Sequence, residues 1–524
     1  MADLLATFVL ALYCLALGLL LPFAGHRAYL WRLSRRADPR PSKPWVGALP
    51  HVTVQLPVFN EKHVIERLVD AACQLDYPSD RLQIQVLDDS NDETTRLAQG
   101  RVDHWRRAGV NVALHRRPER TGFKAGALAA GLKGATGEFV VVLDADFVPR
   151  SDLIHQLLPP FSDPSVGMAQ ARWDHLNESD SWLTRAQALL LDGHFFFEQK
   201  GRYRGGRFFN FNGTGGMWRK EALVSAGGWH FDTLTEDLDV SYRAQMAGWR
   251  FVFLDAVGVP AELPRSLGAL LVQQRRWAKG GIQTAAKILP TLLRGRQSLA
   301  VKLEAFIHLC GHVAHPLTLA LGLLVLPSAW ARRRLALDEL WWLDLALFGL
   351  ATGPFLFFYF AAAKERGRPR PWSGVLNTIA LGVGMSVFLS RAVFRGFRRT
   401  RDPFERTPKL GADRASSYEV SMGRDRGLWP ARILGAWMAI QVVIASLAGF
   451  WASVPFILLF AGGYLRLGFG AGLTLPVAHP LRGLEEEDRP DRQPHHRPGP
   501  SRLWPDTGGL VGSQSPIAEE YEPA

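Results

Sequence analysis

The chain has 524 residues, 47% of them hydrophobic, and a formal net charge of +12. This length allows a catalytic domain plus a separate apolar helical region. The three cysteines exclude a disulfide framework and a cysteine zinc site, because Cys14 and Cys310 lie inside apolar stretches. The positive charge does not predict nucleic-acid binding, because arginines cluster beside apolar stretches, where they suit a membrane surface and an anionic ligand.

The first apolar stretch runs from Leu4 to Ala24 without a charged residue and is long enough to cross a bilayer. A cleaved signal peptide is the alternative, but it would have a basic N-terminal region, and here only Asp3 precedes the stretch. We therefore expect residues 1–26 to be a retained transmembrane anchor. The arginines that follow it predict that its C-terminal side is cytoplasmic.

Residues 40–282 alternate between short apolar stretches and amphipathic ones. Helices are predicted at 61–73 and 94–108, and strands at His51–Val58, Leu82–Leu87, Glu138–Leu143, Val166–Ala171 and Arg250–Leu254. This alternation is typical of a mostly parallel, doubly wound α/β sheet. In such sheets, ligands bind beyond the carboxyl ends of the strands.

Two acidic pairs follow predicted strand ends. Asp144 and Asp146 could hold Mg²⁺ or Mn²⁺ through carboxylate oxygens, although a solvated turn would explain one such pair alone. The second pair, Asp88 and Asp89, favours ligand binding, and we expect one of its members to contact the base and ribose of a nucleotide. Lys124 could contact the phosphates, with a solvated lysine as the alternative.

The segment Thr235–Asp237 predicts the start of a helix with Thr235 as its N-cap. Asp237 is the leading candidate for a general base beside an acceptor hydroxyl. Alternatively, both carboxylates only complement the helix dipole, which we expect of Glu236 on the acceptor-binding side of the site. Upstream, the backbone at Asn212, Gly213 and Thr214 could approach an acceptor closely.

The segment QQRRW supplies three further candidate site residues, Gln273, Arg276 and Trp277. A guanidinium can bind a pyrophosphate through two hydrogen bonds, and an indole offers a flat face for a sugar ring. Packing at a membrane interface is the alternative for an Arg-Trp pair.

Beyond this segment, residues 283–303 are amphipathic and basic, which predicts a helix on the membrane surface. A transmembrane bundle is expected over 304–470, with apolar stretches at Ala305–Leu326, Leu340–Ala363, Trp372–Ser390, Ile433–Phe450 and Ser453–Leu465. The basic segment 391–409 would lie outside the cell if 372–390 crossed, so we assign 372–412 to an interfacial or gating segment. Five crossings remain, with an external N-terminus, although Arg332–Arg334 would then lie on the external side.

Two remaining features carry no assigned chemistry. His308, His312 and His315 share one face of an apolar stretch, where they could line a conduit, hold a metal or only bond neighbouring helices. The tail, residues 478–524, is rich in proline, arginine and glutamate and is expected to be disordered.

Taken in order, five motifs resemble those of family 2 glycosyltransferases of the cellulose synthase type: LDDS (87–90), LDADF (143–147), FNGTGG (211–216), TED (235–237) and QQRRW (273–277). Three longer segments are similar to the cellulose synthase-like A and C subfamilies, which include glucomannan and β-glucan synthases: AQARWDHLN (169–177), FFNFNGTGGMWR (208–219) and PAELP (260–264). The resemblance covers about residues 40–411.

The resemblance implies a Rossmann-like GT-A domain inserted in a helical membrane bundle, and transfer with inversion to a β-linked product. It implies that Asp89 contacts the nucleotide, that Asp144 and Asp146 contact diphosphate and metal, and that Asp237 is the base. Gln273, Arg276 and Trp277 would bind the diphosphate and the acceptor terminus. The segment 404–411 resembles a gating loop, from which Arg406 and Pro408 depart.

Three functions are compatible with these features. A processive β-glycan synthase would use UDP-glucose or GDP-mannose, and a non-processive enzyme would glycosylate diacylglycerol, ceramide or polyprenyl phosphate. A catalytically inactive scaffold is disfavoured, because every expected acidic residue is present. We expect a multi-pass membrane protein, in the inner membrane if the source is bacterial, with a cytoplasmic catalytic domain. The sugar, an export partner and self-association stay open.

Overall fold

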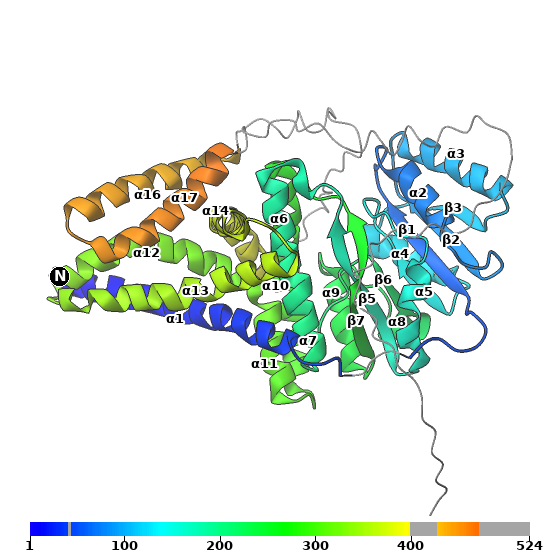
Figure 1. Cartoon of the computed structure of the whole chain (residues 1–524), viewed down its shortest axis with the longest axis horizontal. Helices are drawn as coiled ribbons and strands as arrows, with labels where there is room; N and C mark the ends of the chain where they lie inside the picture. The colour runs from blue at the N-terminus through cyan, green and yellow to red at the C-terminus, as the bar shows by residue number, and fades with distance from the viewer. Residues whose placement is uncertain (40–42, 399–426, 471–524) are drawn as a thin grey trace, which may run out of the picture. The chain divides into compact units, whose positions relative to one another are not determined.

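The computed structural model describes residues 1–39, 43–398 and 427–470. Its α/β region is built on a seven-stranded sheet of order β3-β2-β1-β4-β6-β5-β7 (Figure 1). The strands are β1 (Val52–Val58), β2 (Leu82–Asp88), β3 (Val112–Arg116), β4 (Phe139–Val142), β5 (Val166–His175), β6 (Gly216–Arg219) and β7 (Arg250–Ala261). The segments 404–411 and 478–524 discussed above lie outside the described residues.

The sheet is mostly parallel, as predicted. β1 pairs in parallel with β2 and β4, β2 with β3, and β5 with β7, whereas β6 runs antiparallel to β4 and β5. All five predicted strands are present, and β3 and β6 are additional. The apolar residues of β4 are fully buried at the centre of the sheet. Because β1 pairs in parallel with β2 and with β4, the carboxyl ends of these three strands lie at one edge.

Helices connect the strands and extend toward the apolar region. The connecting helices are α2 (Ile65–Cys73), α3 (Thr94–Arg107), α4 (Phe123–Lys133), α5 (Leu153–Leu157), α8 (Lys220–Ser225) and α9 (Glu236–Met246). A longer helical run consists of α6 (Trp182–Gly193), a π-helical turn (His194–Gln199) and α7 (Lys200–Arg204). Two more helices follow β7, α10 (Leu267–Arg294) and α11 (Leu299–Leu309).

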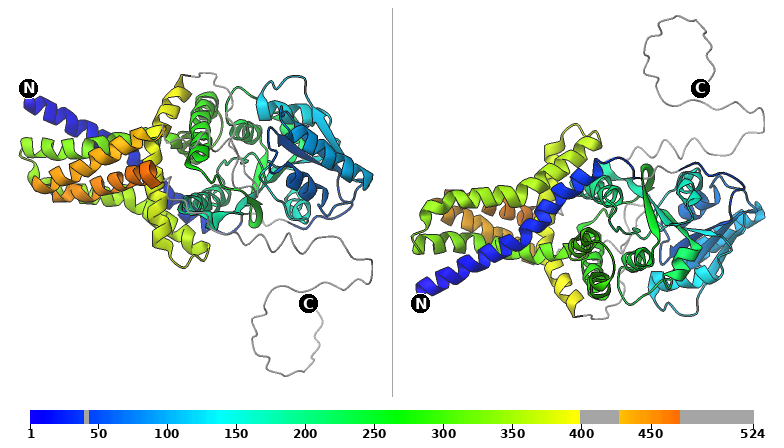
Figure 2. Two further views of the ribbon diagram at one scale, coloured as in Figure 1. Left: turned by 90° about the horizontal axis from the view of Figure 1, so that it is seen from above. Right: turned by 90° about the horizontal axis from the view of Figure 1, so that it is seen from below.

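Six helices of the described residues are long and apolar enough to cross a membrane. They include α1 (Ala2–Ser34), α12 (Ala314–Arg334), α13 (Trp341–Glu365), α14 (Pro371–Phe397), α16 (Trp429–Leu447) and α17 (Val454–Gly470). Figures 1 and 2 show that α14 runs crosswise to the other five. The prediction of five crossings, with 372–412 as an interfacial or gating segment, differs from these six candidate helices by α14 and stays a prediction.

Two predicted helices are divided in the structure. The stretch 283–303 belongs partly to α10 and partly to α11, because the chain leaves the helix at Gly295 and Ser298 begins the next one by accepting a hydrogen bond from the Val301 N–H. The stretch 305–326 is also interrupted, since α11 ends at Leu309 and a 3₁₀ turn at Gly311–Val313 precedes α12.

The α/β region is joined to the long helices by a cluster of ion pairs at the α13–α14 connection. Arg366 lies 2.7 Å from Asp174, which belongs to the part of β5 that pairs with β7, and Arg368 lies 2.5 Å from the buried Asp192 of α6. Arg368 also pairs with Glu178 at 2.7 Å. Burial opposes ionisation of Asp192, but His175 and both arginines hold its pKa below the ordinary value.

The predicted topology places Arg332–Arg334 on the external side of the membrane, where arginine is disfavoured. Each of these arginines has an acidic partner in the structure. Arg334 pairs with Asp3 at 3.0 Å and Arg333 with Asp338 at 3.6 Å, so the start of α1 and the α12–α13 connection lie at the same end of the bundle. Arg332 donates to Asp344 at 2.9 Å, and both side chains are buried. Pairing removes most of the local positive charge that would argue against this topology.

Asp344→Asn should leave the buried Arg332 without its carboxylate and lower the free energy of unfolding by about 3 kcal/mol or more. The double variant Arg332→Met/Asp344→Leu removes both charges and should be about as stable as the parent protein. Thermal unfolding of the three purified proteins in one detergent checks this. Identical unfolding midpoints for Asp344→Asn and the parent would contradict it.

Candidate active site

A cavity of about 640 Å³ begins at the carboxyl ends of the strands and continues between the long helices. Asp89, Asp144 and Asp237 line its first part, and His312 and Phe460 line its far part. Residues that the sequence scatters over more than 300 positions therefore share one continuous space.

Of the acidic pair Asp88 and Asp89, only Asp89 lines the cavity. The Asp89 carboxylate lines the cavity and accepts two hydrogen bonds from Arg117, at 3.0 Å from Nε and 2.5 Å from Nη2. Asp88 is 1% exposed and accepts from the Ser90 N–H at 2.9 Å and the Thr95 hydroxyl at 2.6 Å. Side chains alternate in direction along an extended chain, so only Asp89 remains available to a ligand.

Lys124 connects the second acidic pair to the glycine-rich segment. Its Nζ lies 2.6 Å from Asp144 Oδ1 and donates to the Gly213 carbonyl at 2.9 Å. Burial opposes the charge, but Asp144, Glu236 and Asp237 together hold the pKa of Lys124 above its ordinary value. Lys124 is therefore a fixed positive charge inside the cavity, which Asp146 also lines.

The segment Asn212–Thr214 passes beneath these groups. Gly213 has φ of +82°, and a Cβ placed on it would lie 3.1 Å from Asp237 Oδ2 and 3.4 Å from Lys124 Nζ. Thr214 is 1% exposed, and its hydroxyl accepts from the Asp144 N–H at 2.9 Å. Asn212 and Gly213 line the cavity, whereas Thr214 holds the backbone of Asp144 in place from behind.

Glu236 and Asp237 form the first turn of α9, and both line the cavity. Burial, followed by repulsion from Glu236, raises the pKa of Asp237 to about 7 against the opposing charges of Lys124 and Arg276. A carboxyl with such a pKa can accept a proton near neutral pH. This is the electrostatic environment expected of a general base.

The first half of α10 brings the last predicted residues to the same cavity. Ser266 caps this helix by accepting from the Ala269 N–H at 3.2 Å. Gln273, Arg276 and Trp277 then follow on one side of the helix, and all three line the cavity. The structure thus brings together the predicted residues except for Asp88 and Thr214, which lie behind it.

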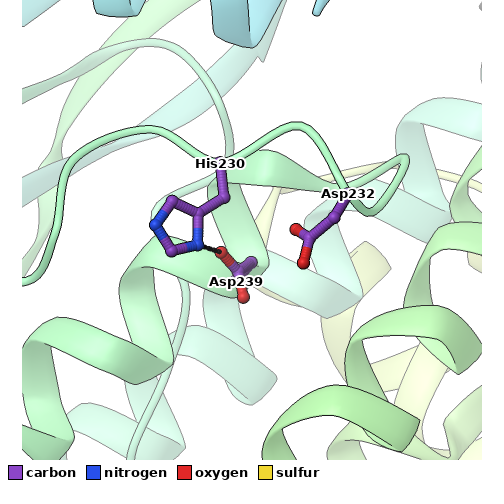
Figure 3. Close-up of side chains that lie close together, drawn as sticks. All are labelled: His230, Asp232 and Asp239. Carbon is purple, nitrogen blue, oxygen red and sulfur yellow. Dashed lines mark ion pairs between the residues drawn. The ribbon is translucent and has the colours of Figure 1, made fainter.

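The three histidines of the apolar region line the cavity further in, although the chain is interrupted between them. His308 Nδ1 lies 2.9 Å from the Tyr242 hydroxyl, and the rings of His312 and His315 stack with centroids 5.8 Å apart. In the part of the chain that is described, the one group of three side chains placed to share a metal lies elsewhere, at His230, Asp232 and Asp239 (Figure 3).

Sequence reasoning missed several residues that line the cavity. Arg120 lies 3.3 Å above the Phe59 ring beside Asp89, and Phe59 could have been found from its place directly after a buried strand. His194 and Glu198 also line the cavity, and Glu198 pairs with Arg27 of α1. Both belong to the π-helical turn, whose register no sequence pattern predicts.

Comparisons with known proteins show what the chain is similar to. Residues 50–280 match the family model described as "Glycosyltransferase like family 2". The "Probable glucomannan 4-beta-mannosyltransferase 10" of Arabidopsis thaliana is 38% identical over 289 residues, which are 53% of this chain and 52% of the relative. The "Glucomannan 4-beta-mannosyltransferase 1" of Oryza sativa subsp. japonica is 38% identical over 305 residues, 56% and 58% of the two chains.

The chain therefore spans only about half the length of these relatives in each match. Among solved structures, the mannosyltransferase PcManGT of Pyrobaculum calidifontis, in complex with GDP-Man and Mn²⁺, has a TM-score of 0.48 and 22% identity. That likeness covers 76% of this chain and 99% of the other.

Substitutions at two glycines with positive φ, Gly213 and Gly206, distinguish a loss of activity from a loss of stability alone. Gly213→Ala and Gly206→Ala should each lower the free energy of unfolding by roughly 1–2 kcal/mol, because L residues avoid this backbone conformation. A Cβ at Gly206 meets no atom within 4 Å, whereas at Gly213 it approaches Asp237 and Lys124. Only Gly213→Ala should therefore lose turnover, measured beside thermal unfolding. Equal turnover of the two variants would contradict this.

Proposed function

Because residues 50–280 match the model of a family 2-like glycosyltransferase, we propose that this chain is a membrane-embedded inverting glycosyltransferase that elongates a β-linked polysaccharide. The observation that supports this most is the single cavity in which candidate donor-binding, catalytic and acceptor-binding groups meet and which continues among apolar helices. The mannosyltransferase names of the relatives favour an activated mannose as donor, and GDP-mannose is the first candidate. UDP-glucose is the alternative.

Each candidate residue has a defined part in the transfer. Asp89 binds the nucleoside, while Lys124, Gln273 and Arg276 bind and neutralise the diphosphate. Asp144 and Asp146 supply carboxylate oxygens suited to Mg²⁺ or Mn²⁺, which would stabilise the charge of the departing diphosphate.

Asp237 accepts the proton of the acceptor hydroxyl as its oxygen bonds to the anomeric carbon. The bond from that carbon to the diphosphate breaks on the opposite face, which inverts the configuration. Trp277 lies four residues beyond Gln273 on the same side of α10 and offers its ring face to the terminal sugar of the acceptor. Glu236 contributes mainly by raising the pKa of its neighbour.

The inner part of the cavity supports elongation rather than a single transfer. His308, His312, His315 and Thr318 provide polar groups that a glycan can meet as it leaves the site. Further along, the lining becomes apolar at Leu321, Val383 and Phe460, which would also accommodate the hydrocarbon tail of a lipid acceptor. The product must therefore be examined for both outcomes.

The proposal is tested with the full chain in lipid nanodiscs, with Mg²⁺ or Mn²⁺ and radiolabelled GDP-mannose and UDP-glucose in parallel. We expect long products that remain in the aqueous phase and are degraded by a β-mannanase. A short product that partitions into organic solvent would show that the protein is a glycolipid synthase and not a polysaccharide synthase. Long products formed from UDP-glucose alone would show that the donor is UDP-glucose and not GDP-mannose.

The pH dependence of transfer tests the assignment of Asp237. Because its pKa is raised to about 7, the base is protonated below this pH, and kcat/KM should fall toward acid with a midpoint near 7. Glu236→Gln removes a repulsive charge and should move the midpoint to lower pH, while Asp237→Asn should be inactive at every pH. A midpoint near the ordinary aspartate value of 3.8, or one that Glu236→Gln leaves unchanged, would contradict the assignment.

A further inference from the structure

One side of α10 carries polar and small residues over about four helical turns. Gln273, Arg276 and Trp277 of this stripe line the cavity, and the same side continues at the 3.6-residue period. Its next members are Gly280, Gln283, Thr284 and Lys287. These four do not line the cavity with Trp277, and they contact a different part of the chain.

The second half of the stripe contacts the segment that carries the proposed base. Gln283 accepts a hydrogen bond from the Leu234 N–H at 3.1 Å, and Thr284 shares one with the Thr235 hydroxyl at 3.0 Å. At Gly280 a Cβ would lie 2.6 Å from a Thr235 methyl and 3.0 Å from the Leu234 carbonyl carbon. Only glycine permits this approach of the helix to the Thr235 backbone.

Lys287 completes these contacts through the cluster drawn in Figure 3. Its Nζ lies 2.7 Å from Asp232, 2.9 Å from the buried Asp239 and 3.1 Å from His230 Nδ1. This ammonium and the Arg243 guanidinium offset the charges of the two carboxylates, so the cluster is an ion-pair network. Asp239 follows Asp237 by two residues in α9 and also pairs with Arg243 at 2.7 Å.

We propose that Gly280, Gln283, Thr284 and Lys287 are positioning residues that hold Asp237 at a fixed distance from Trp277. One rigid helix then carries the acceptor platform in its first half and the base segment in its second half. The inference rests on the proposed function, in which Asp237 removes the acceptor proton. It assigns to Lys287 a part in transfer although this residue does not line the cavity.

Lys287→Met tests the proposal because Asp239 keeps its pair with Arg243, so the fold should persist. We expect kcat to fall about 10- to 100-fold, the loss that a misplaced reacting group causes, while the affinity for GDP-mannose measured by calorimetry stays unchanged. Lys287→Arg should restore most of kcat. Arg294→Met, which removes an exposed cation from the same helix, should retain the parent kcat.

Gly280→Ala provides a second test in which a helix-stabilising residue is introduced. Alanine favours the helical backbone over glycine, yet its Cβ displaces Thr235, so kcat should fall without loss of donor affinity. If Asp237→Asn is inactive but Lys287→Met and Gly280→Ala keep the parent kcat, the positioning role is wrong. If donor affinity falls in parallel with kcat, the contacts are merely structural. An active Asp237→Asn would instead overturn the proposed function.

Discussion

The Lys124 ammonium makes the central cavity possible. Asp144 follows β4, whereas Glu236 and Asp237 begin α9, and all three carboxylates line one cavity. Three like charges there would repel one another and resist desolvation. Lys124 opposes this at 2.6 Å from Asp144, and it also holds the Gly213 carbonyl at 2.9 Å. One cation thus joins the strand edge, the glycine-rich segment and the helix that carries the proposed base.

The same balance of charges extends to the apolar helices. A helical bundle in a bilayer tolerates polar groups only where they are paired or line a cavity. Here Glu304 of α11 accepts from Arg202 at 2.8 Å and lies 2.9 Å from His26 of α1, and all three are buried. The ion pairs of Arg366 and Arg368 join α13 to β5 and α6. The buried charges where the sheet meets the long helices are therefore paired.

The sequence was sufficient for every parallel strand except β3 and for most of the candidate residues that line the cavity, because apolar runs and acidic strand ends depend on local pattern. It did not reveal β6, whose four residues are too short for a period and pair in the antiparallel direction between β4 and β5. Nor could it separate Asp88 from Asp89, since their roles depend on Thr95 and Arg117, which tertiary contacts bring there. The π-helical turn and the interruption at Gly311 likewise depend on packing.

The most direct measurement is an electron cryo-microscopy structure of the full chain in nanodiscs, trapped with a product chain during turnover. The continuous cavity predicts glycan density that begins at Trp277, beside Asp237, and passes His308 and His315 into the bundle. Density that leaves the site toward the aqueous side of the sheet would contradict this. So would an acceptor whose hydrocarbon tail, and not its glycan, fills the space beside Leu321 and Phe460.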